Sequence, residues 1–429
     1  MRDIRLRVFL IAGLSTLFLG CTLIALRPTE EASTPTLPAP SATLTPTKTP
    51  APTPTPSPLP SPTADPCPAR QSVAFPDLPS TFPDGYVEAL RSYLAQGGEP
   101  AALQAGLRAW DVLPPEPDSG PLWGDLTGDG VTETVAAFIN AQAEIFPPPG
   151  ALAIFACRDG TVETLASYAP GIASFIWPLG IADLTEDGVS DLAFADINCG
   201  AHTCWFTVRV WAWTDGQFQE QVEGDFSLPY AGFKIEDGQI HGYSAGMGSV
   251  GAGPQRPYTE TWRWNGEVIT FATEEVGPPR FRYHAFQDGD QALYVEDYDA
   301  AFDAYLRVIN DDDLDPWAGL YDAYEERRWL TALAQWRLLT MGMHLGNFPD
   351  AEMRYERLQM DYPPDTPGYP VAVLAERFWS QYQETGNVAY GCIEAVNAPE
   401  VEAVLSFLNS FGYANPTYAA EDLCPFLMP

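Results

Sequence analysis

Basic side chains and histidines are scarce in this chain. Its 429 residues include 22 Lys and Arg against 57 Asp and Glu, with four His, so the formal net charge is −35. Nucleic-acid affinity comes largely from Lys and Arg contacts to phosphates, so this composition argues against DNA or RNA as a partner. It favours instead a soluble surface that attracts cations.

Familiar catalytic motifs are also missing. The sequence contains neither HExxH nor GxSxG, and its histidines are scattered without a Ser or Cys nucleophile beside them. The segment GMGSVG (246–251) matches a dinucleotide-binding pattern, but Pro254 and Pro257 follow where a helix should begin, so a flexible loop is expected. We therefore predict a protein that is not an enzyme. A cell-surface hydrolase acting on polysaccharide or peptide is the alternative.

The N-terminus has the features of a targeting segment. Three arginines precede an uncharged apolar run (8–26), which predicts that residues 1–27 are a signal rather than part of the fold. Within it, LFLGC (17–21) resembles the lipobox of bacterial lipoproteins, which implies that Cys21 is lipidated. Because the run continues past Cys21 for nearly the thickness of a bilayer core, an uncleaved signal anchor is the alternative. Both place the remaining chain outside the cytoplasm, anchored to the cell membrane through its N-terminus.

Residues 28–68 form a tract of Pro, Thr and Ser that includes TPTPTPSPLPSP. Such a composition cannot bury a core, and polyproline II geometry extends it by about 3.1 Å per residue. We predict a disordered stalk on the order of 100 Å long, which separates the folded part from the membrane.

Six cysteines remain besides Cys21, and six allow fifteen pairings. The Cys199–Cys204 pair is favoured because a four-residue gap closes a turn between two strands. Cys392 with Cys424 would then tie down the C-terminus, and Cys67 with Cys157 follows by elimination. A zinc site that uses His202 between the two cysteines is the alternative.

The pattern of apolar residues divides the rest of the chain into three parts. Residues 69–115 read as a helical cap, with Leu90 and Leu94 at helical spacing. Residues 116–285 alternate apolar and polar positions between Asp-Gly and Asn-Gly turns, which predicts a β domain. From residue 290 to 429 apolar residues recur every three or four positions, which predicts helices.

Within this helical part, GNFPDAEMRYERLQMDYP (346–363) resembles the second helix of a tetratricopeptide repeat. The resemblance implies an array of helical hairpins whose concave face binds a protein or a cell-envelope polymer. An unrelated helical bundle is the alternative. The acidic run DDDLD (311–315) is expected to be a solvated turn or helix cap, or otherwise a weak cation site.

Two short acidic stretches carry the strongest functional signal. LWGDLTGDGVTE (122–133) and IADLTEDGVSD (181–191) both place oxygen-bearing side chains at alternate positions around a glycine. Calcium takes six to eight oxygen ligands, and a sharply turned loop can aim alternate residues at one point. The predicted ligands are Asp125, Thr127, Asp129, the Val131 carbonyl and Glu133 in the first loop, and Asp183, Thr185, Asp187, the Val189 carbonyl and Asp191 in the second.

These loops resemble the calcium loops of FG-GAP and VCBS-type repeats. The resemblance implies a structural rather than a catalytic calcium ion. Because only two such motifs occur, we expect a short propeller-like or sandwich domain rather than a closed propeller. Ion-free hairpins closed by Asx-turns are the alternative. The predicted fold class is therefore multidomain β plus α, and the predicted function is a calcium-binding module at the cell surface that binds or scaffolds a partner.

Overall fold

The computed structural model of the protein describes residues 68–200 and 202–426. The predicted targeting segment with Cys21, the stalk up to residue 67 and Cys67 lie outside the described residues. The described residues belong to one compact unit, Pro62–Pro429. They combine antiparallel sheets with α-helices, which confirms the β plus α class. Among them, no helix is both long enough and apolar enough to cross a membrane.

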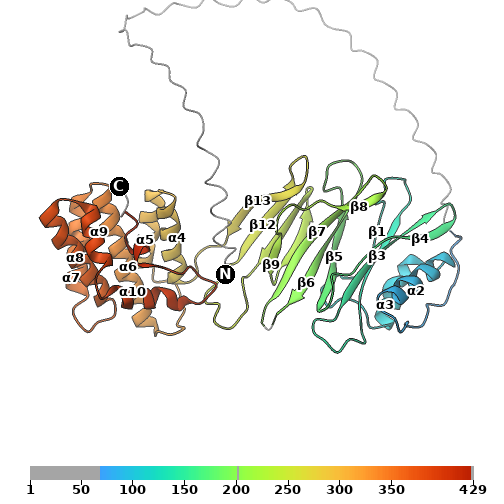
Figure 1. Cartoon of the computed structure of the whole chain (residues 1–429), viewed down its shortest axis with the longest axis horizontal. Coiled ribbons are helices and arrows are strands. Elements are labelled where there is room, and N and C mark those ends of the chain that lie inside the picture. Colours follow the sequence, from blue (N-terminus) through green and yellow to red (C-terminus); the bar gives the residue numbers. More distant parts are fainter. Residues whose placement is uncertain (1–67, 201, 427–429) are drawn as a thin grey trace, which may run out of the picture. The chain divides into compact units, whose positions relative to one another are not determined.

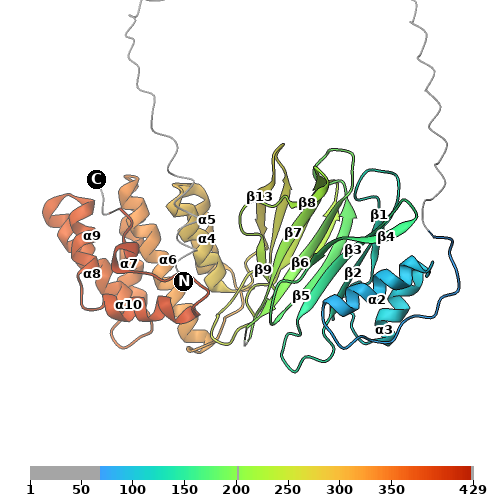
Figure 2. The same ribbon diagram turned by 45° about the vertical axis from the view of Figure 1, so that its right-hand side comes forward.

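A small helical layer opens the described chain. It consists of α2 (Asp84–Ala95), the 3₁₀ helix η1 (Pro100–Ala102) and α3 (Leu103–Ala109). α2 ends where Gly97 adopts a φ of 85°, a conformation that favours glycine. The buried face of these helices packs on the first sheet, with Leu90 and Leu107 in one cluster with Phe138 and Phe155. Figure 2 shows this layer beside the strands that it covers.

The β region consists of three separate antiparallel sheets, in each of which the main strands follow chain order (Figure 1). The first sheet contains β1 (Leu122–Gly124), β2 (Glu133–Ile139), β3 (Gly150–Arg158) and β4 (Thr161–Tyr168). The second contains β5 (Ser174–Ala182), β6 (Asp191–Cys199), β7 (Cys204–Thr214) and β8 (Gln217–Glu220), with β9 (Ser227–Pro229) paired to β7. The third contains β10 (Gly232–Glu236), β11 (Gln239–Ser244), β12 (Tyr258–Trp264) and β13 (Ile269–Val276).

Neighbouring sheets pack through their apolar faces. Because strand side chains alternate between two faces, β2 and β6 can each contribute to the core on both sides. Ile154 of the first sheet shares a buried cluster with Phe194 of the second. Val208 of the second shares another with Ile240 and Trp262 of the third. The β region is therefore held together by sheet-on-sheet burial.

The C-terminal part is helical, and successive helices from α4 to α9 pack against each other. Its α-helices are α4 (Arg282–Tyr294), α5 (Tyr298–Asn310), α6 (Ala323–His344), α7 (Phe348–Asp361), α8 (Tyr369–Thr385), α9 (Val388–Val396) and α10 (Val401–Leu408). The tetratricopeptide-like segment covers α7. There Ala351 is buried against Gly342 of α6, and Leu358 is also buried.

The break between the two parts lies earlier than the sequence suggested. β13 ends at Val276 and α4 begins at Arg282, so positions 285 and 290 both fall inside α4. The pair Asp288-Gly289, whose composition is typical of a turn, lies inside this helix. A Cβ added at Gly289 would come within 2.5 Å of the Tyr305 ring of α5, so this glycine permits close helix packing.

The C-terminal segment folds back onto the helices. It includes the 3₁₀ helices η2 (Asn409–Phe411) and η3 (Ala420–Leu423), and a disulfide joins Cys424 to Cys392 of α9. The Trp336 indole of α6 donates a hydrogen bond to the Leu423 carbonyl at 2.6 Å. The Phe411 ring stacks on Tyr283 of α4. This face of α4 and α6 is therefore covered by the protein's own C-terminus.

Candidate metal centre

The two acidic loops occupy equivalent positions in neighbouring sheets. Residues 125–132 join β1 to β2, and residues 183–190 join β5 to β6. The flanking strands pair in the same register, with Gly124 opposite Glu133 and Ala182 opposite Asp191. The similarity of the two sequences is therefore also a similarity of local structure.

The first acid of each loop reaches across the loop to a glycine. Asp125 accepts a hydrogen bond from the Gly130 amide at 2.9 Å, and Asp183 accepts one from the Gly188 amide at 3.0 Å. Both glycines have positive φ, 85° and 87°, and nothing lies within 4 Å of an added Cβ at either. The backbone conformation, and not a lack of space, thus favours glycine here.

The middle acid of each loop caps the following turn. Asp129 and Asp187 each accept a hydrogen bond at 2.8 Å from the backbone amide two residues further on. This is the contact of an Asx-turn. One carboxylate oxygen of each acid makes it.

The last acid of each loop is turned inward. Glu133 accepts a hydrogen bond from the Leu126 amide at 2.7 Å, and Asp191 accepts one from the Leu184 amide at 2.8 Å. The threonine at the third position of each loop donates its hydroxyl to the same acid, at 3.4 Å in the first loop and 3.0 Å in the second. In this conformation each threonine hydroxyl is hydrogen-bonded to the last acid of its own loop.

Burial disfavours the charged form of both last acids. Glu133 is fully buried, and desolvation, reinforced by Asp129 and Asp125, raises its pKa to about 7 although the Leu126 amide opposes the shift. Desolvation likewise raises the pKa of Asp191. Each loop therefore holds one carboxylate in a place where a nearby positive charge would stabilise it.

The oxygen atoms of the two loops suit a hard cation, but in this structure they do not converge on one point. Calcium prefers carboxylate, hydroxyl and carbonyl oxygens, all of which are present. Within residues 68–200 and 202–426, however, no three Asp, Glu, His or Cys side chains lie close enough together to hold a metal ion. Calcium binding would require the Asp125 and Asp129 carboxylates to turn from backbone amides toward a common centre.

The loops touch one another across the two sheets. A Cβ added at Gly128 would lie 2.9 Å from the Val189 side chain, and one added at Gly124 would lie 2.7 Å from Ile181. The third sheet has only the two-residue turn Asp237-Gly238 at the corresponding place. The three sheets thus present their first turns along one edge.

This edge, which we call the acidic edge, is formed by residues 125–132, 159–160, 183–190, 215–216, 237–238 and 265–268. These turns contain no basic side chain. Their acids are Asp125, Asp129, Asp159, Asp183, Glu186, Asp187, Asp215, Asp237 and Glu267. Such a concentration of one sign attracts cations.

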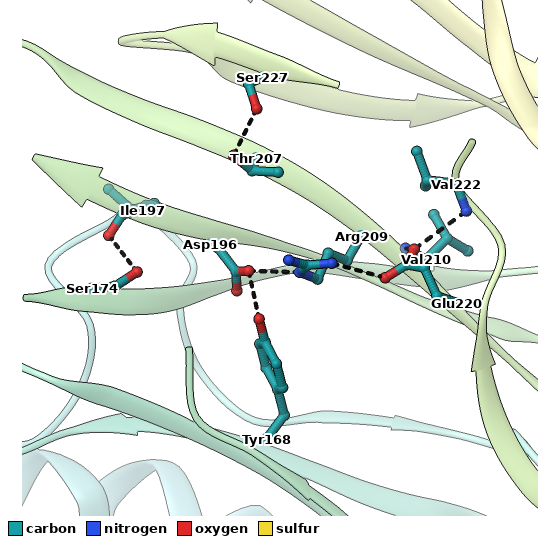
Figure 3. A network of polar contacts seen from close by, with 10 residues as sticks. All are labelled: Tyr168, Ser174, Asp196, Ile197, Thr207, Arg209, Val210, Glu220, Val222 and Ser227. Atoms are coloured by element: carbon teal, nitrogen blue, oxygen red, sulfur yellow. Dashed lines mark hydrogen bonds and ion pairs between the residues drawn. The ribbon is translucent and has the colours of Figure 1, made fainter. Parts of the chain in front are cut away.

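A second polar cluster, which sequence reasoning missed, lies between the first two sheets (Figure 3). Asp196 of β6 accepts hydrogen bonds from the Tyr168 hydroxyl at 2.7 Å and the Arg209 guanidinium at 2.6 Å. Arg209 also contacts Glu220 at 3.3 Å. Burial and the hydrogen bond that the Tyr168 hydroxyl donates to the Asp196 carboxylate raise the pKa of Tyr168 to about 12. The only sequence signal was an acid in the apolar run of β6, and the cluster joins β4 to β6 and β7.

Other sequence candidates have structural explanations. Cys199 and Cys204 form a disulfide with an S–S distance of 2.00 Å, which leaves no thiolate for a zinc site with His202. In the acidic run, Asp312 pairs with Arg327 and Asp311 with Arg307. The glycine-rich segment 246–251 leads to β12 and not to a helix.

Comparisons with known proteins add no relative. No protein-family model matches this chain, and no curated protein matches it significantly. The similarity to FG-GAP and VCBS-type calcium loops therefore depends on residues 122–133 and 181–191 alone.

Proposed function

We propose that this is a membrane-tethered, extracytoplasmic calcium-binding protein that acts as a binding or scaffold module at the cell surface. The observation that carries the proposal is the pair of matched acidic loops. Each has the same three carboxylate contacts at the same spacing, and the loops meet at Gly128 and Val189. Chance would not easily produce both.

Electrostatics explain why a cation would bind there. The loops place Asp125, Asp129 and the buried Glu133 within one short turn, where their charges repel. A bound calcium ion would offset this repulsion and the burial of Glu133. Because the loops of the first two sheets touch each other at Gly128 and Val189, the ion would stabilise the packing of those sheets. We propose a structural role, in a short propeller-like arrangement whose blades are the three antiparallel sheets.

The proposed location follows from the N-terminal sequence and from the cysteines. Residues 1–27 supply the proposed lipid anchor or signal anchor, and residues 28–68 the proposed stalk. The disulfides Cys199–Cys204 and Cys392–Cys424 are typical of oxidising compartments outside the cytoplasm.

The proposed partner is a protein or a cell-envelope polymer that contacts the helical part. One face of α4 and α6 is covered by the C-terminal segment, so a partner would use the remaining surface. On α7 the side chains of Phe348, Met353 and Met360 are exposed, and on α9 those of Tyr390 and Ile393. Exposed apolar side chains of this kind favour protein contacts when they form a contiguous patch.

Thermal unfolding with and without calcium tests the proposal. Residues 62–429 should gain about 2–4 kcal/mol when calcium exceeds its Kd by about 100- to 1,000-fold, and magnesium should have less effect because of its strict octahedral geometry. Combining Asp129→Asn with Asp187→Asn should remove the gain while Asn keeps the turn contacts. Asp159→Asn with Asp215→Asn removes the same charge from two other turns of the acidic edge and should leave the gain intact. Identical melting in calcium and in chelator would overturn calcium binding.

A further inference from the structure

The edge opposite the acidic edge has the reverse character. β2 and β6 run away from the acidic loops, so Ile139 and Cys199 end on the far edge, opposite Gly150 and Cys204. We call this far edge the apolar edge. It is formed by residues 140–149, 169–173, 200, 202–203, 230–231 and 245–257.

The apolar edge is nearly uncharged in a protein of net charge −35. Its acid is Glu144, and its base is Arg256, which pairs with Asp288. The acidic edge of the same three sheets carries an acid in every turn and no base. The two edges therefore differ in charge: the acidic edge is negative, and the apolar edge carries few charged side chains.

Large apolar side chains project from this edge into solvent. Three of them are largely exposed to solvent: Phe146 is 79 % exposed, Ile172 is 83 % exposed and Val250 is 83 % exposed. They come from three different connections, before β3, before β5 and before β12. At the same edge the rings of Trp205 and Tyr230 are partly exposed.

The connections form one continuous surface. A Cβ added at Gly150 would meet the Phe175 backbone at 2.6 Å, which places the first two sheets in contact at this edge. The Tyr230 hydroxyl donates a hydrogen bond to the His202 carbonyl at 2.8 Å. A Cβ added at Gly248 would lie 2.9 Å from the Tyr230 ring. All three sheets therefore contribute to the apolar edge.

We propose that the apolar edge docks on a lipid bilayer, with Phe146, Ile172 and Val250 inserted at the boundary between headgroups and acyl chains. Separate projecting tips suit insertion between lipids better than they suit a flat protein contact. Aromatic residues with one polar end, such as Trp205 and Tyr230, favour the membrane–water interface. A surface with so few charged groups loses little ion solvation when it enters this layer.

The charge of the acidic edge does not oppose this orientation. β3 has nine residues, Gly150–Arg158, so the two edges are roughly 25–30 Å apart at about 3.3 Å per residue. The Debye length in physiological salt is about 8 Å. The charge of the acidic edge is therefore screened from a membrane at the apolar edge. The acidic edge would face away from the bilayer.

The inference rests on the tether in the proposed function. A chain fixed to the membrane holds its folded part at a high effective concentration near the lipid. Weak insertion is therefore sufficient to keep the apolar edge on the bilayer. The tether supplies proximity, and the three side chains supply orientation.

Vesicle flotation tests the inference. Residues 62–429, the compact unit that contains all four hydrophobic clusters, are mixed with phosphatidylcholine vesicles, with and without phosphatidylglycerol. Binding to both vesicle types is expected, with little dependence on salt because no basic cluster takes part. Phe146→Ser, Ile172→Ser and Val250→Ser should each lower the partition coefficient about five- to tenfold.

The matched control is Leu320→Ser, because Leu320 is 79 % exposed but lies before α6. It should leave flotation unchanged. Failure of the wild-type unit to float, or an equal loss in Leu320→Ser, would overturn the inference. A triple variant combines Phe146→Ser, Ile172→Ser and Val250→Ser. A dimer in solution that this triple variant abolishes, without flotation, would assign the edge to a second copy of the chain instead.

The same preparations separate this inference from the proposed function. The calcium-dependent gain in stability is measured on the triple variant and should be intact. Fractionation of the full chain tests the tether: a membrane-bound full chain with a unit 62–429 that does not float would contradict only the docking, whereas a full chain free of the membrane would contradict the tether.

Discussion

Gly128 of the first acidic loop lies directly against Val189 of the second, although the two residues are far apart in the sequence. A Cβ at position 128 would come within 2.9 Å of the Val189 side chain. The absence of a side chain at Gly128 therefore allows the loops of two sheets to meet. Any change in one loop should affect the other.

Replacing this glycine should destabilise the protein by more than its backbone conformation explains. Gly128 has a φ of 74° and Gly130 a φ of 85°, so alanine is strained at both positions. Gly130 has nothing within 4 Å of an added Cβ. We expect Gly130→Ala to cost about 1–2 kcal/mol of unfolding free energy, and Gly128→Ala about 1–3 kcal/mol more because of overpacking. Urea denaturation measures both, and equal losses would show that the loops do not press on each other.

A buried ion pair should be the most sensitive charged contact of the helical part. The Arg337 side chain is 3 % exposed and contacts Asp290 at 2.9 Å, and the Tyr305 hydroxyl donates a hydrogen bond to the same carboxylate. Asp290→Asn leaves a buried guanidinium without its counter-charge and should cost about 3–5 kcal/mol. The control is Asp312→Asn, whose exposed pair with Arg327 should contribute less than about 1 kcal/mol. Similar losses in the two variants would contradict this assignment.

Acid should destabilise the protein through His284. This side chain is 1 % exposed, and burial together with the charge of Arg256 lowers its pKa to about 4, although the Pro254 backbone opposes the shift. In the unfolded chain the pKa is about 6.5, so between these values the unfolded state binds a proton that the folded state does not. The free energy of unfolding is therefore unaffected by His284 above about pH 6.5. It falls by up to about 3 kcal/mol as the pH drops to about 4, because the unfolded state gains the proton first.

Measuring the unfolding free energy against pH for the wild type and for His284→Phe checks this prediction. The variant lacks the titrating group, so its loss of stability between about pH 6.5 and 4 should be smaller by the same amount. Parallel pH curves would exclude His284 as a source of acid sensitivity.

The two disulfides should differ in their contribution to stability. Cys392–Cys424 closes a separation of 32 residues, and Cys199–Cys204 one of 5. Chain entropy predicts contributions of about 3.7 and about 2 kcal/mol. Replacing both members of each pair by Ser should reproduce this order in urea denaturation, and the larger loss should be accompanied by faster proteolysis of the C-terminus. Unreduced peptide mapping checks the pairing itself, and free thiols at positions 199 and 204 would refute it.

Local sequence features predicted local structure well. Cys199 and Cys204 were expected to close a turn between two strands, and they pair opposite one another between β6 and β7. The glycines of the two loops were expected at sharp bends, and Gly130 and Gly188 both have positive φ. These features depend on dihedral preferences and on neighbours a few residues away, so the sequence carries them directly.

Gly289 illustrates where local reasoning failed. Beside Asp288 it has the composition of a turn, but it lies within α4 because Tyr305 of α5 packs against its bare backbone. The balance between a turn and a helix was decided by a contact with another element. The same reasoning applies to Asp312 of the acidic run, because its ion-pair partner Arg327 is supplied by α6.

The sequence by itself determined the β plus α class, the two acidic loops and the nearest disulfide, because each follows from residues adjacent in the chain. Only the tertiary structure decided that Gly128 meets Val189, that Asp196 binds Tyr168, and that the two edges of the sheets carry opposite character. These relationships join residues separated by tens of positions. They depend on the sum of many weak packing contacts across sheets and helices, and no short stretch of sequence contains that sum.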